Sequence, residues 1–172
     1  MFVRNVSEFL WRSSLIGLIA FAASDAVAAQ DYVSGHGALQ IWDAEGQANA
    51  PRWVQIWLYI MLAAFATGLL FVWRRVEARW VVGGFLAVVI TAILSQSMTD
   101  IVPLSGFFAL LHLVFWSPAL FLLLTRRPFA KERSLYAAWS ALITGVILFS
   151  FIFDIRDAAI YLDHITGVGL FS

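Results

Sequence analysis

The sequence contains no cysteine, and only 13% of its 172 residues are charged. The absence of cysteine excludes a disulfide scaffold and any zinc or redox site that is built from thiols. The eleven Lys and Arg residues balance the eleven Asp and Glu residues, so the formal net charge is zero. This balance excludes a nucleic-acid binder that is held by a basic surface, and the low polarity excludes a disordered chain.

Hydrophobic residues make up 62% of the chain, well above the ~45–50% that is typical of soluble domains. They gather in four apolar stretches, at residues 53–73, 80–98, 104–125 and 135–153. Each stretch is long enough to cross a hydrocarbon core of about 30 Å. Backbone polar groups in lipid must be satisfied within their own segment, so each stretch is expected to be a helix. The sequence therefore predicts an all-α integral membrane protein.

The connections between consecutive stretches are short, which favours antiparallel neighbours and an up-down-up-down four-helix bundle. Small residues recur at steps of four in the second and fourth stretches, a spacing that lets helix backbones approach closely. Such a stripe packs either within the chain or against another subunit, and packing within the chain is the expected arrangement. The candidate helix-packing residues are Gly83, Ala87, Thr91, Ser95, Ala141 and Gly145.

The N-terminal region divides into two segments ahead of the helices. Residues 1–29 have the features of a signal peptide, with Arg4 and Arg12 before a short apolar run and small residues at its end. The alternative for this segment is a short N-terminal anchor. Residues 30–52 are polar and are expected to form an exported arm, and residues 53–172 hold the transmembrane domain and a C-terminal tail.

The distribution of Lys and Arg predicts the orientation of the helices. Bases gather in loops 74–79 and 126–134, whereas the intervening turn and the C-terminal segment are poor in them. The positive-inside rule then places both loops in the cytoplasm and both mature termini outside, in a bacterial-type inner membrane. A cleaved signal peptide would supply the exported N-terminus that this topology requires.

His112 is the only ionisable residue well inside an apolar stretch. Ionisable groups inside a membrane are costly and therefore raise a functional hypothesis. His112 is either a neutral histidine hydrogen-bonded to another helix, a proton relay or ligand contact, or an axial ligand to haem or chlorophyll. The lack of a second intramembrane histidine disfavours haem. Asp154, at the outer end of the fourth stretch, projects from a face that can meet His112.

Further carboxylates lie at the outer end of the fourth stretch. Asp154 and Asp157 are three residues apart and share a helix face, so they repel each other. Arg156 is expected to point elsewhere, which leaves Arg52 as the candidate counter-ion. The alternative is a cation-attracting vestibule with Asp100 as a third member. Apolar spacing at 155–162 predicts a helix extension or a separate amphipathic helix.

The sequence has none of the motifs of hydrolases, metalloproteases or nucleotide-binding proteins, so we expect no catalysis, no cofactor and no metal. The favoured function is an accessory or assembly subunit that binds other membrane proteins, or itself, through small-residue helix faces. The first alternative is a homo-oligomeric cation channel or a proton-linked small transporter that uses His112 and the outer carboxylates. The second alternative is a membrane enzyme that acts on lipid or quinone.

Overall fold

The computed structural model describes residues 37–99 and 104–170, and it is all-α apart from one isolated β-bridge. The predicted signal peptide at 1–29 and the candidate Asp100 lie outside the described residues. In chain order the elements are η2 (Gly37–Leu39), α2 (Ala44–Asn49), α3 (Arg52–Gly68), α4 (Val76–Thr99), α5 (Ser105–Arg126), α6 (Pro128–Lys131) and α7 (Leu135–Thr166).

Three helices, α4, α5 and α7, are long and apolar enough to cross a membrane. Their lengths and hydropathy suit a multi-pass membrane protein, as the sequence predicts. The first predicted stretch differs, because α3 ends at Gly68 after 17 residues, or about 25 Å. Arg79 donates hydrogen bonds to the carbonyl oxygens of Val72 and Trp73, at 2.8 and 3.2 Å. These bonds satisfy backbone groups in the turn that follows α3, so the helix does not need to continue.

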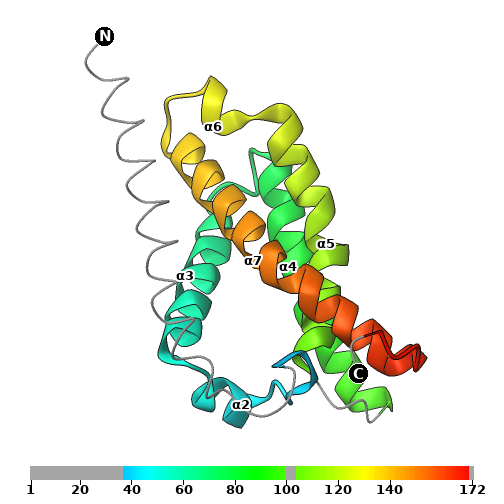
Figure 1. The fold of residues 1–172 in the computed structure, drawn as a ribbon. Coiled ribbons are helices and arrows are strands. Elements are labelled where there is room, and N and C mark those ends of the chain that lie inside the picture. Colours follow the sequence, from blue (N-terminus) through cyan, green and yellow to red (C-terminus); the bar gives the residue numbers. More distant parts are fainter. Residues whose placement is uncertain (1–36, 100–103, 171–172) are drawn as a thin grey trace.

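The long helices pack side by side in alternating directions. Figure 1 shows the α3–α4 turn and α6 at one end of the molecule, and α2 and η2 at the other. Helix α3 contacts α4 and α7, α4 contacts α5, and α5 contacts α7. The two basic segments predicted from the sequence, 74–79 and 126–134, therefore lie at the same end.

Aromatic side chains fill the centre between the helices. Phe65 of α3 and Trp116 of α5 are 2% and 1% exposed, and their ring centroids lie 4.7 Å apart. Phe85 of α4 stacks on Phe65 at 5.0 Å. Trp139 of α7 donates its indole N–H to the carbonyl oxygen of Ala64 at 2.9 Å. Ring packing and this hydrogen bond thus join all four long helices.

The small residues of α4 pack on a different face from the one expected. A Cβ at Gly84 would lie 2.5 Å from the carbonyl oxygen of Phe115, so α4 and α5 make their close approach there. Gly83 is exposed, and a Cβ at that position would meet no atom within 4 Å. The expected packing within the chain is therefore absent at Gly83. The buried face follows Val81, Gly84, Val88 and Ala92, while Ala87, Thr91 and Ser95 are half-buried.

The polar arm is folded against the helices over its described part. Element η2 contacts α5 and α7, and Ala38 within it is fully buried. The N–H of Ser105 donates to the carbonyl oxygen of Gln40 at 2.8 Å. Gly106 permits this packing, because a Cβ there would lie 3.0 Å from the carbonyl oxygen of Ala38 and 2.6 Å from the Cβ of Tyr161 on α7. Residues 37–41 thus cover the ends of α5 and α7.

Helix α7 is one continuous helix of 32 residues, about 48 Å long. The Ser134 hydroxyl accepts the N–H of Ala137 and caps its start. Gly167, with φ of 67°, ends it in the left-handed conformation that glycine favours. The fourth stretch and the predicted extension are therefore a single element, which confirms the extension and excludes a separate amphipathic helix.

Candidate functional site

A histidine and an aspartate from different helices meet between α5 and α7. The Nδ1 atom of His112 lies 3.3 Å from each carboxylate oxygen of Asp154. The hydroxyl of Ser150, one turn earlier on α7, donates to Asp154 Oδ2 at 2.8 Å. Asp154 is 8% exposed and the His112 side chain 17%. The pair is therefore largely shielded from its surroundings, and the predicted meeting of Asp154 with His112 is present.

The imidazole of His112 is held in place by Trp116, which lies one turn along α5. The two rings stack with centroids 4.0 Å apart and planes inclined by 14°. This stack orients the ring so that Nδ1 faces α7. A protonated imidazole also gains from lying over an indole face, through cation–π attraction. The position therefore suits the neutral and the protonated forms of His112.

A histidine and an aspartate at hydrogen-bond distance can hold one shared proton, as an imidazolium and a carboxylate that are neutral together. A carboxylate buried among apolar helices is costly without such a partner. The contact between His112 and Asp154 therefore joins α5 to α7 through one acidic and one basic side chain.

The ion pairs of the outer carboxylates differ from those that the sequence predicts. Arg156 Nη1 lies 3.8 Å from Asp157 Oδ1, so the expectation that Arg156 points elsewhere is wrong. Among the described residues, 37–99 and 104–170, no ion pair joins Arg52 to Asp154 or Asp157. The reason is that Asp154 turns inward to His112, whereas Arg52 is exposed at the start of α3. Asp100, the third member of the proposed vestibule, is outside the described residues.

Two further hydroxyl groups on α7, those of Ser140 and Thr144, bond to their own helix backbone. Ser140 donates to the carbonyl oxygen of Ala137 at 2.8 Å, and Thr144 donates to that of Ser140 at 2.6 Å. On α4, Ser95 likewise donates to the carbonyl oxygen of Thr91 at 2.7 Å. These groups are satisfied by backbone and add no ligand to the His112–Asp154 pair.

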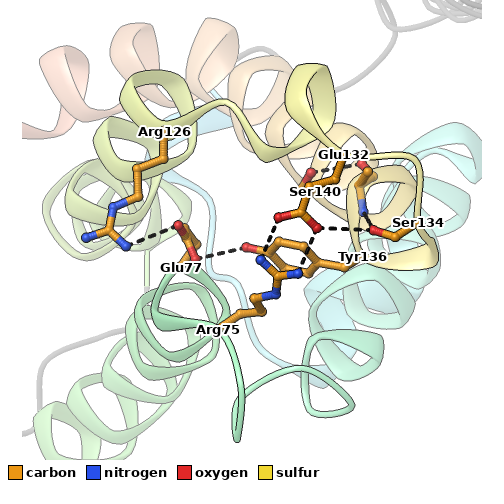
Figure 2. Close-up of polar contacts among 8 residues, drawn as sticks. Arg75, Glu77, Arg126, Glu132, Ser134, Tyr136 and Ser140 are labelled. Atoms are coloured by element: carbon orange, nitrogen blue, oxygen red, sulfur yellow. Dashed lines mark hydrogen bonds and ion pairs between the residues drawn. The ribbon is translucent and has the colours of Figure 1, made fainter.

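A second polar cluster, which the sequence analysis missed, lies at the basic end of the molecule (Figure 2). Glu77, in the first turn of α4, is 7% exposed. Its carboxylate accepts the hydroxyl of Tyr136 at 3.0 Å and lies 3.3 Å from Nη1 of Arg126. These contacts join α4 to α5 and α7.

A salt bridge extends this cluster toward α6. The guanidinium of Arg75 donates two bonds to the Glu132 carboxylate, at 2.6 and 2.7 Å, and lies 4.4 Å from the centre of the Tyr136 ring. Hydrogen bonding to Glu132 raises the pKa of Arg75 above its ordinary value. The cluster holds one end of the bundle together, and we assign it a structural role.

One sequence signal could have revealed this cluster. Glu77 and Glu132 are isolated acids within otherwise basic segments. The bases of these segments predict the orientation of the helices, but a count of bases does not assign partners to the two acids. Their contacts are 49 to 59 residues apart along the chain, which local spacing does not predict.

Comparison with protein-family models, curated proteins and solved structures finds no match for this chain. The interpretation of its function therefore depends on the residues themselves. Within the described ranges, no three His, Asp or Glu residues gather in a group that could hold a metal ion.

Proposed function

We propose that this chain is a small proton-linked transporter of a bacterial-type inner membrane, and that the proton itself is the ion that it carries across. The observation that carries the proposal is the shielded His112–Asp154 pair, which joins two helices that could cross a membrane. An ionisable pair at such a place defaults to a functional hypothesis because it is costly to keep there. The proposal is for a non-catalytic protein whose working ligand at this pair is the proton.

The proposed topology is an up-down-up-down bundle with its basic end in the cytoplasm. Helix α3 serves as the fourth, shorter member beside α4, α5 and α7. The contact between Arg75 and Glu132 supports this topology, because it ties the two basic segments together at one end. The opposite end, where η2 packs on α5 and α7, then faces the outside.

The proposed mechanism links the charge of the pair to helix packing. A proton reaches the ring of His112 from the outer side, and the pair changes from one negative charge to none. Attraction between imidazolium and carboxylate then draws α5 and α7 together, and loss of the proton toward the cytoplasm releases them. The stacked Trp116 keeps the imidazole oriented through both states.

Proton flux into proteoliposomes tests the proposal. The full-length protein is reconstituted with an entrapped pH-sensitive dye, and a potassium gradient with valinomycin supplies the driving potential. We expect flux above that of protein-free liposomes, and loss of this flux in His112→Gln and in Asp154→Asn. His164→Gln, which changes an exposed histidine near the end of α7, serves as the matched control and should retain it.

Gel filtration and circular dichroism establish that each variant is folded before its flux is compared. Wild-type protein that passes no protons would contradict the proposal. Folded variants of both residues with wild-type flux would contradict it equally.

A second candidate function is an accessory or assembly subunit, as the sequence favours. The supporting observation is on α7, where Ala141 and Gly145 are half-buried and a Cβ at Gly145 would meet nothing within 4 Å. Small residues four apart, unused within the chain, suit close approach of another helix. Gly145→Leu should then abolish co-purification of a stoichiometric membrane partner, while Ala63→Leu on the exposed side of α3 should not. Retained co-purification in Gly145→Leu would remove this face as an interface.

A further inference from the structure

A groove of about 270 Å³ lies between α4 and α5 on the outside of the molecule. Arg79 and Trp80 line it near the start of α4, at the basic end. The groove follows α4 from Arg79 to Ala87, which is eight residue steps or about 12 Å. The remaining wall is apolar or small, and consists of Gly83, Gly84, Ala87, Val114, Phe115 and Pro118.

The polar end of this groove carries a positive charge. Arg79 is exposed, and its guanidinium is fixed by bonds to the carbonyl oxygens of Val72 and Trp73. These neutral acceptors leave its charge in place, and none of the ion pairs among the described residues includes Arg79. The acid nearest in sequence, Glu77, already bonds Arg126 and Tyr136. A ligand at this end must therefore bring its own negative charge.

Trp80 adds a second feature of a membrane interface. Its side chain is 48% exposed beside Arg79, and tryptophan is enriched at the depth of lipid headgroups. The groove thus has a cationic end with an exposed indole, followed by an apolar channel. An amphipathic molecule with an anionic head and a hydrocarbon tail is complementary to both parts.

The charge and the depth of the groove favour an anionic lipid as its occupant. The groove is closed at its floor, because α4 and α5 are in direct contact at Gly84 and Phe115. An apolar transmembrane helix laid on the groove would bring no negative charge to Arg79, whereas a lipid headgroup does. A single acyl chain is thinner and can lie along the exposed Gly83.

We propose that the α4–α5 groove binds one anionic phospholipid of the leaflet at the basic end. The phosphate lies at Arg79, the headgroup region contacts Trp80, and one acyl chain runs over Gly83 and Ala87. Basic pockets between transmembrane helices are known sites for anionic headgroups. This site is separate from the His112–Asp154 pair and stands whether or not that pair carries protons.

Native mass spectrometry with defined lipids tests the site. The full-length protein is equilibrated in mixed detergent micelles with phosphatidylglycerol or phosphatidylcholine as the probe, and retained lipid is counted. We expect one phosphatidylglycerol to be retained in preference to phosphatidylcholine. Arg79→Gln should weaken its retention about fivefold, the effect of losing one arginine contact. Gly83→Phe fills the groove and should abolish retention of either lipid.

Two controls separate charge at the site from other effects. Arg79→Lys keeps the positive charge but loses the guanidinium hydrogen bonds to the carbonyl oxygens of Val72 and Trp73. This variant should keep the preference for phosphatidylglycerol. Arg133→Gln removes an exposed base outside the groove and should bind as the wild type does. Equal retention of both lipids by the wild type, or an unchanged preference in Arg79→Gln, would overturn the proposal. A protein dimer that Gly83→Phe dissociates would overturn it in favour of a second copy at this face.

Discussion

Alanine substitution at two adjacent glycines gives a sharp test of how α4 packs. In Gly84→Ala the new Cβ would lie 2.5 Å from the carbonyl oxygen of Phe115, a distance at which the α5 backbone must move. In Gly83→Ala the new Cβ would meet no atom within 4 Å. Both changes remove a glycine from the interior of the same helix, so the gain in helix propensity cancels between the two variants. Their difference in stability reports the close contact of α4 with α5, at the carbonyl group of Phe115 and the ring of Trp116.

The expected difference follows from the cost of inserting a methyl group into a packed contact. Such overpacking costs about 1–3 kcal/mol, so Gly84→Ala should be less stable than Gly83→Ala by that amount. For a chain of this size, 1 kcal/mol shifts the Tm by about 2–4 °C. Gly83→Ala should therefore melt about 2–12 °C above Gly84→Ala when both are measured in the same detergent. Equal melting temperatures, or a more stable Gly84→Ala, would refute the packing of α4 on α5 described above.

Three further predictions concern the basic end of the bundle, and each is measured by melting in detergent. Ser134→Ala removes the N-cap of α7 and should cost about 1 kcal/mol; no change in Tm would show that the cap is not formed. Tyr136→Phe leaves the buried Glu77 carboxylate without its hydroxyl donor and should cost about 1–3 kcal/mol, whereas a neutral effect would contradict that contact. Because Glu132 raises the pKa of Arg75, the stability that this shift contributes is fully present below the ordinary arginine pKa and is lost only above it. Raising the pH from about 7 to about 9 should therefore leave the destabilisation caused by Arg75→Gln unchanged, and a decline over that range would contradict the pairing.

The fold class was predictable because hydropathy and length identify membrane helices without tertiary information. Helices α4 and α5 begin and end close to the apolar stretches that predict them, and α7 begins where its stretch begins but continues to Thr166. The end of α3 was not predictable in this way, since residues 69–73 are apolar yet lie in a turn. Exposed Leu69, Leu70 and Trp73 extend the hydrophobic pattern past the end of the helix. The side chain of Arg79, six and seven residues later in the chain, bonds the carbonyl oxygens of Trp73 and Val72 in this turn.

The candidate site was predictable in part. Placing His112 and Asp154 on faces that can meet requires only helical periodicity, and the structure brings them together. The counter-ion of the outer carboxylates was wrongly assigned to Arg52, because helical spacing relates residues of one helix and does not place the start of α3 against α7. The sequence predicts that α4 packs through Gly83, whereas the structure packs it through the next residue, Gly84. The prediction missed by one residue because small residues lie on two neighbouring faces of α4.

The most direct test of the central claim is a reciprocal exchange of the His112–Asp154 pair in the proton-flux assay. Proton flux is measured for His112→Asp, for Asp154→His, and for the double variant that carries both changes. If the two residues act as one proton-binding pair, each single variant loses its flux and the double variant regains a substantial part of it. A folded double variant as inactive as the singles, or single variants that pass protons at the wild-type rate, would contradict the claim.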